Sequence, residues 1–170
     1  MAQDEIQKAL DRFRDHVIKQ AKSNLTRMGK NSSKKLYNSI KGNVKAMPNS
    51  ISMEFEMEDY GFYQDKGVSG VKKKYDTQFS YKSKMPPPSK LDKWVVRKGL
   101  APRKEKGQFA TRKGLNFVIA RSIFINGIKP SLFFTKPFEA AYKNLPDELI
   151  EKFGIEASKL FMDTITQPKK

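Results

Sequence analysis

The apolar residues at the start of the chain recur at steps of three and four, the spacing of one face of an α-helix. The repeat covers residues 4–28 and contains seven apolar positions: Ile6, Leu10, Phe13, Val17, Ala21, Leu25 and Met28. Asp4 and Glu5 suit the first turn, because carboxylates interact favourably with the dipole at a helix N-terminus, and Gly29 is a typical terminator. The pattern predicts one long helix that buries a single apolar stripe.

A period of two replaces this spacing over residues 51–57. Apolar side chains alternate there with polar ones and occupy one face of the segment: Ile51, Met53, Phe55 and Met57. Turn-forming residues precede it at positions 48–50, and residues 41–47 are the expected partner strand. The sequence therefore predicts a hairpin of two antiparallel strands.

Apolar periodicity disappears after Gly67. Residues 67–88 are rich in Lys, Gly and Pro, which predicts a long extended loop, and residues 101–113 predict a second basic loop. Between the loops, a short helix is expected to start at Ser89 as its cap and to end at Gly99.

Three more helices are predicted in the last third of the chain, over residues 115–125, 138–143 and 147–165. The first would present an apolar face made of Leu115, Val118, Ile119, Ser122 and Ile123. We expect an α+β fold, in which a small antiparallel sheet is covered on one face by the N-terminal helix and by the helix near 115–125. The most apolar segment, residues 115–128, is too short to span a bilayer and carries Arg121, so no membrane association is predicted.

Charge is strongly uneven along the chain. The 170 residues include 34 Lys and Arg against 18 Asp and Glu, a formal net charge of +16. Residues 51–65 contain five acidic and no basic residues, whereas residues 66–113 contain 15 basic and three acidic ones. The chain has no Cys and only one His, His16, which leaves almost no material for disulfides, thiolate or His-based metal sites, a Cys nucleophile or a Ser-His triad.

Four carboxylates are concentrated at the acidic segment: Glu54, Glu56, Glu58 and Asp59. Carboxylates at this spacing are compatible with a hard-metal site or an acid–base pair. Neighbouring carboxylates on one strand face diverge, however, and no second acidic cluster completes a cage. The favoured interpretation is a solvated or interface strip that docks against a basic surface of a neighbouring subunit. His16 has no nucleophile near it in sequence and is interpreted as a polar helix residue.

The two basic loops present cations interleaved with aromatic residues. The candidate contact residues for DNA or a protein partner are Lys72, Lys73, Lys74, Lys82, Lys84, Arg103, Lys104 and Lys106, and the aromatic residues between them are Tyr75, Phe79, Tyr81 and Phe109. Lysines gain affinity for polyphosphate by releasing counterions, and aromatic rings stack on exposed bases. Without a helix-turn-helix, zinc finger or phosphate loop in the sequence, the pattern permits nucleic-acid contact but does not specify it.

One segment, Tyr60-Gly61-Phe62-Tyr63-Gln64-Asp65-Lys66-Gly67, resembles the Tyr-Ala-x-Tyr-x-Glu-x-Gly signature of the tail-completion and neck proteins of tailed bacteriophages. The order of elements is also similar to that family. Residues 36–40, Leu-Tyr-Asn-Ser-Ile, lead into the first strand, and residues 129–141 resemble its aromatic-proline segment. The resemblance covers about residues 1–145, departs from the family in the basic insertions at 67–88 and 101–113, and leaves residues 146–170 as a C-terminal helical extension.

The resemblance implies a virion structural protein without catalysis, cofactor or metal. Its copies would form a ring, a hexamer or dodecamer, at the head-tail junction as a neck, tail-completion or tail-terminator protein. Its partners would be other connector and tail proteins, with contact to packaged DNA. A ring contact is heterologous and joins two complementary surfaces. The acidic residues with Tyr60 and Tyr63 are the expected subunit interface.

Two other functions are compatible with the residues. The net charge suits a stand-alone basic nucleic-acid-binding protein, and Glu54, Glu56 and Asp59 around a divalent metal would suit a nuclease.

Overall fold

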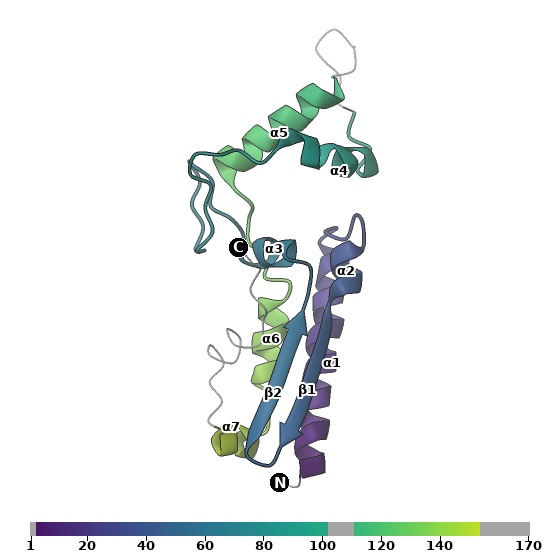
Figure 1. Cartoon of the computed structure of the whole chain (residues 1–170), viewed down its shortest axis with the longest axis vertical. Coiled ribbons are helices and arrows are strands. Elements are labelled where there is room, and N and C mark those ends of the chain that lie inside the picture. Colours follow the sequence, from purple (N-terminus) through teal and green to yellow (C-terminus); the bar gives the residue numbers. More distant parts are fainter. Residues whose placement is uncertain (1–2, 102–110, 154–170) are drawn as a thin grey trace. The chain divides into compact units, whose positions relative to one another are not determined.

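The computed structural model describes residues 3–101 and 111–153, which form two compact units. The first unit contains the described residues up to Asp65 and from Leu132 on, and the second contains residues 66–131. The elements labelled in Figure 1 are, in chain order, α1 (Gln3–Arg27), α2 (Lys35–Ser39), β1 (Lys41–Met47), β2 (Ser50–Glu56), α3 (Tyr60–Lys66), α4 (Asp92–Arg97), α5 (Arg112–Asn126), α6 (Thr135–Tyr142) and α7 (Asp147–Phe153), with a 3-10 helix η1 (Pro88–Leu91) before α4.

The first unit is a two-layer α+β structure, as the sequence predicts. Strands β1 and β2 pair as an antiparallel hairpin in the register Val44 opposite Met53, and the hairpin lies along α1 (Figure 1). Phe55 on β2 is fully buried, and its ring contacts Phe134 and Phe138 at centroid distances of 5.2 and 6.2 Å. Helices α1 and α6 therefore cover one face of the sheet.

The periodic stripe of α1 is confirmed at six of its seven positions. The six side chains from Ile6 to Leu25 are at most 3% exposed. Met28 is 39% exposed, so its assignment to the stripe was wrong. The helix ends at Arg27, one residue before Met28, and Gly29 follows with a φ of 62°, so the buried stripe ends with the helix.

Side chains of α1 close the outer edge of β1. Gln7 donates from Nε2 to the carbonyl oxygen of Val44 at 3.1 Å, and its Oε1 accepts from the backbone N–H of Ala46 at 2.7 Å. Gln3 donates to the carbonyl oxygen of Ala46 at 3.3 Å. These amides replace the hydrogen bonds that a further strand would make with β1.

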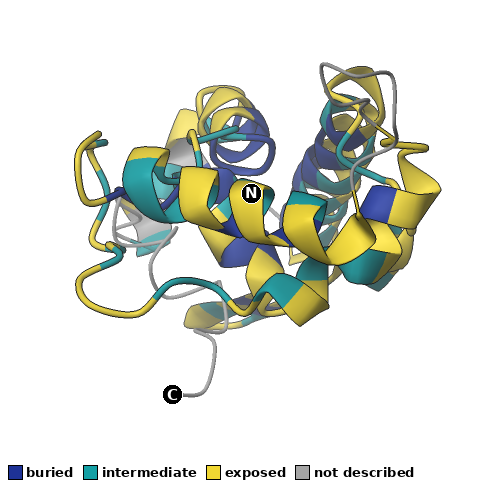
Figure 2. Cartoon of the chain, turned by 90° about the horizontal axis from the view of Figure 1, so that it is seen from above, coloured by how far each residue is buried: buried dark blue, intermediate teal, exposed yellow. Residues whose placement is uncertain are grey.

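In the second unit, residues 67–87 contain no helix and no strand of a sheet, as predicted for this loop. Two isolated bridges hold this loop, one between Val68 and Ile128 and one between Ser69 and Ser80. Residues 67–70 at the start of this loop are buried, whereas residues 71–87 are exposed or intermediate; Figure 2 colours the chain by this burial.

Helix α5 was expected to cover the sheet and to bury an apolar face that includes Val118, and both expectations were wrong. It packs against η1 and α4 within the second unit, and the helix that packs with α1 in the first unit is α6. The buried positions of α5 are Asn116 and Ala120, whereas Val118 is 63% exposed. Eight of the eleven positions from 115 to 125 are apolar, so periodicity did not single out the buried face; the side chain of the buried Asn116 donates to Asp92 at 3.0 Å.

The remaining boundaries differ in detail. Ser89 lies inside η1, whose cap is Pro87, so Ser89 is not the predicted cap. The sequence divides the chain into a domain of residues 1–145 and an extension of residues 146–170. Leu145 and Leu149, one from each part, belong to the same hydrophobic core cluster. The helix predicted over residues 147–165 is confirmed over Asp147–Phe153, as α7, and residues 154–165 lie outside the described part of the chain. None of the helices in the described ranges is long and apolar enough to cross a membrane.

Candidate interaction surfaces

The acidic residues predicted as a subunit interface divide into two pairs. Glu54 and Glu56 lie on the exposed face of β2, opposite Asn43 and Lys41 of β1. Within the described ranges, neither carboxylate makes an ion pair. Side chains two apart on a strand share one face, so the two carboxylates lie side by side, as the alternation predicts, with Lys41 opposite Glu56 in the register.

Glu58 and Asp59 follow β2 and have different surroundings. Lys35 of α2 donates to Glu58 at 2.9 Å, and this hydrogen bond raises the pKa of Lys35 above its ordinary value. The backbone N–H of Glu58 donates to Ser39 Oγ at 3.0 Å, whereas Asp59 is exposed. An open hollow of about 710 Å³ lies between α2 and the end of β2 and includes both carboxylates in its lining. Glu58 is therefore partly neutralised within the chain.

The acidic cluster does not form a metal cage. Over the ranges that the structure covers, no three His, Cys, Asp or Glu residues are placed to hold a metal ion together. The nuclease hypothesis thus gains no ligand set from the geometry of Glu54, Glu56 and Asp59.

The segment that resembles the phage signature forms α3. Tyr60 and Tyr63 are 43% and 37% exposed, so both predicted interface tyrosines are accessible in the isolated chain. Gly61 packs closely, because a Cβ there would lie 2.6 Å from Met57 Sδ and 2.8 Å from Leu36 Cδ1. Gly67 has a φ of 75°, in the left-handed region that favours glycine. Gly61 thus allows a close approach of α3 to Leu36 and Met57, and Gly67 allows the positive φ that follows α3.

Asp65, in the same segment, has a role that the sequence reasoning missed. Its carboxylate is buried and accepts hydrogen bonds from the backbone N–H of Phe134 at 2.8 Å and of Thr135 at 3.2 Å, and from the hydroxyl of Thr135. It therefore caps the N-terminus of α6 from 70 residues away in sequence. An acidic residue directly before the Lys-Gly that ends α3 was the only local signal.

The lysines of the first basic loop also divide by environment. Lys74 donates to the carbonyl oxygen of Gly70 at 3.0 Å, and Lys73 lies over the ring of Tyr75 at 5.6 Å. Lys72, Lys82 and Lys84 are exposed and make no ion pair with a described residue. The other predicted contact residues, Arg103, Lys104 and Lys106, lie outside the described residues.

Two aromatic residues of this loop have partners inside the second unit. Tyr81 packs against Phe124 with ring centroids 6.2 Å apart, and burial raises the pKa of its hydroxyl. Tyr75 is covered by Lys73, and its backbone N–H donates to Ser69 Oγ at 3.0 Å. Both rings therefore stabilise the loop, which leaves them less available for stacking on bases.

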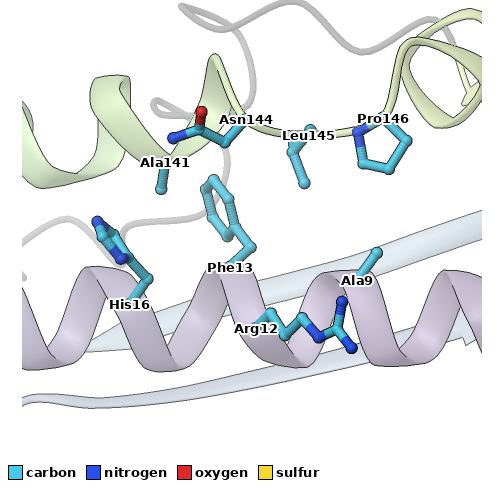
Figure 3. Close-up of a pocket in the computed structure, with 8 residues that line it drawn as sticks. All are labelled: Ala9, Arg12, Phe13, His16, Ala141, Asn144, Leu145 and Pro146. Carbon is cyan, nitrogen blue, oxygen red and sulfur yellow. The ribbon is translucent and has the colours of Figure 1, made fainter.

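A pocket of about 280 Å³ lies in the first unit between α1 and the C-terminal end of α6 with the segment that follows it (Figure 3). Its lining residues are Ala9, Arg12, Phe13, His16, Ala141, Asn144, Leu145 and Pro146. His16 is exposed beside it, and the described residues of the lining include no carboxylate and no Ser, Thr or Cys nucleophile. The pocket therefore lacks partners for general base catalysis by His16.

No protein-family model, curated protein or solved structure matches the chain.

Proposed function

We propose that the protein is a non-enzymatic virion protein of a tailed bacteriophage, whose copies form a closed ring at the junction of head and tail. A ring subunit needs two different surfaces that complement each other, because each copy uses one surface for its left neighbour and the other for its right neighbour.

The separation of unpaired charges carries this proposal. Glu54 and Glu56 lie exposed in the first unit, and Lys72, Lys82 and Lys84 lie exposed in the second, without an ion pair to any described residue. Complementary potentials of this kind fix the register and orientation of protein contacts.

The signature segment adds support. Its glycines and Asp65 perform packing and capping roles, whereas Tyr60 and Tyr63 remain accessible. Tyrosines are enriched at protein interfaces because they combine a large apolar ring with a polar hydroxyl. A segment that is partly structural and partly exposed suits a protein whose main contacts are with other proteins.

The strongest alternative is a stand-alone basic nucleic-acid-binding protein. The exposed lysines favour it, since each phosphate contact releases counterions. Base stacking by Tyr75 and Tyr81 is disfavoured, because both rings already have partners in the loop. With these two rings engaged, the contribution of the exposed lysines would be salt-dependent contact to the phosphate backbone.

Light scattering coupled to size-exclusion chromatography, before and after nuclease digestion, separates these functions. The ring proposal predicts a discrete oligomer whose mass does not change when nucleic acid is removed. A protein that remains a 19.5 kDa monomer at every concentration, and binds duplex DNA with a steep salt dependence, would establish the alternative.

A further inference from the structure

The two edges of the hairpin differ in how their backbone groups are satisfied. Residues opposite each other in an antiparallel pair direct their N–H and C=O groups either toward each other or toward the two outer edges, in alternation. The carbonyl of Val44 and the N–H of Ala46 point away from β2, because both are bound by Gln7. Their partners in the register, Met53 and Ile51, therefore direct their backbone groups to the outer edge of β2.

Among the residues that the structure describes, none pairs with this outer edge of β2. Phe55, opposite Gly42, continues the alternation, so three successive outward residues, Ile51, Met53 and Phe55, offer N–H and C=O groups. No hydrogen bond between described residues uses these groups. An open strand edge is a template for an additional strand, and native proteins usually protect such edges. Here α1 protects only the β1 edge.

The negative charges of Glu54 and Glu56 favour an added strand that carries positive charges. Glu54 and Glu56 project from β2 beside the open edge, so an added strand would place alternate side chains next to them. A second β2 strand paired with this edge would bring four carboxylates onto one face, which is destabilising. A strand that complements the two carboxylates would carry Lys or Arg at positions two apart, because such positions share one face of a strand.

The chain contains such a segment in its own first loop. Lys82 and Lys84 are two residues apart, exposed, and without ion pairs to the residues that the structure describes. The start of this segment is anchored, because Ser69 accepts from the N–H of Tyr81 and donates to the carbonyl of Phe79, each at 2.8 Å. Residues 82–85 continue from this anchor without helix.

We propose that the open edge of β2, with Glu54 and Glu56, binds residues 80–85 of a second copy of this chain, with Lys82 and Lys84 beside the two carboxylates. This contact joins different surfaces of the two copies and is therefore heterologous, as a closed ring requires. The inference rests on the proposed function and names the surfaces by which neighbouring subunits meet.

Disulfide cross-linking between copies tests the contact directly, since the chain has no cysteine of its own. Variants Glu54→Cys and Glu56→Cys are each mixed with Lys82→Cys or Lys84→Cys and oxidised. Residues paired across neighbouring strands bring their Cβ atoms close enough for a disulfide. We expect a covalent dimer in at least one of the four mixtures, and none when Glu139→Cys, on the exposed side of α6, replaces the β2 variant.

Charge reversal provides the second test. Glu54→Lys with Glu56→Lys should reduce the oligomer to monomer, as should Lys82→Glu with Lys84→Glu, and the variant that combines all four changes should recover the oligomer. Two control pairs make the same charge changes at other exposed positions, Glu139→Lys with Glu151→Lys and Lys90→Glu with Lys93→Glu, and should leave the oligomer intact.

The outcomes separate this inference from the proposed function. An oligomer that persists in both reversal variants, with no cross-link in any mixture, would overturn the inference and leave the ring proposal standing. Glu54→Cys cross-linking to itself would also overturn the inference, because it would show β2 edges paired with each other. A wild-type chain that is monomeric at all concentrations would overturn both.

Discussion

Replacement of Asp65 by alanine should destabilise the first unit more than the loss of an ordinary surface charge. The carboxylate is 4% exposed and accepts three hydrogen bonds at the start of α6, from two backbone N–H groups and one hydroxyl of Phe134 and Thr135. Alanine would leave these donors buried without an acceptor.

The size of the effect follows from the hydrogen bonds lost. An unsatisfied buried donor costs about 1–3 kcal/mol, and loss of a helix N-cap typically costs ~1 kcal/mol. The two descriptions overlap at Asp65, so we expect a loss of about 3–4 kcal/mol in the free energy of unfolding. For a chain of this size, that loss lowers the melting temperature by about 10 °C. Asn at this position retains one acceptor oxygen and should cause a smaller loss.

Urea denaturation followed by circular dichroism at 222 nm measures this change. Asp76→Ala is the matched control, because Asp76 is an exposed aspartate of the first loop and makes no ion pair within the described ranges. We expect the order of stability wild type and Asp76→Ala, then Asp65→Asn, then Asp65→Ala. If Asp65→Ala unfolded at the same urea concentration as the control, the long-range cap would not contribute to stability.

Three further substitutions test the packing of the first unit. Phe55→Ala should cost ~3–5 kcal/mol because the ring is fully buried among other phenyl rings, and an unchanged urea midpoint would contradict this packing. Gly42→Ala should cost ~1–3 kcal/mol, since its Cβ would lie 2.8 Å from Cε1 of the buried Phe55 ring; a melting temperature equal to that of wild type would show that the site relaxes freely. Gln7→Ala should accelerate amide hydrogen exchange at Ala46 by removing its acceptor, and equal exchange rates would refute the closed β1 edge.

Periodicity succeeded where each segment has one buried face. The α1 stripe and the alternation of Met53 and Phe55 in β2 are binary patterns at the periods of a helix and a strand, so the buried faces of both elements follow from the sequence. The same reasoning failed in α5. Apolar residues occupy most positions of that helix between 115 and 125, and one of its buried positions, Asn116, is polar and binds Asp92.

The long-range contacts could not be predicted. Asp65 and Thr135 are 70 residues apart, and Gln7 and Ala46 are 39 apart, so no local pattern relates the partners. The sequence identified the candidate carboxylates and lysines, but it did not predict which of them would bind a partner within the chain. Pairing of Glu58 with Lys35 and of Lys74 with Gly70 depends on the folded positions of α2 and the loop.

Native mass spectrometry of the nuclease-treated protein over a range of concentrations tests the closed ring most directly. The account predicts one assembly, at a fixed integral multiple of the 19.5 kDa chain mass, which persists on dilution to the limit of its affinity and then dissociates to monomer. A monomer at every concentration, or a continuous ladder of masses without a preferred size, would contradict a closed ring of subunits.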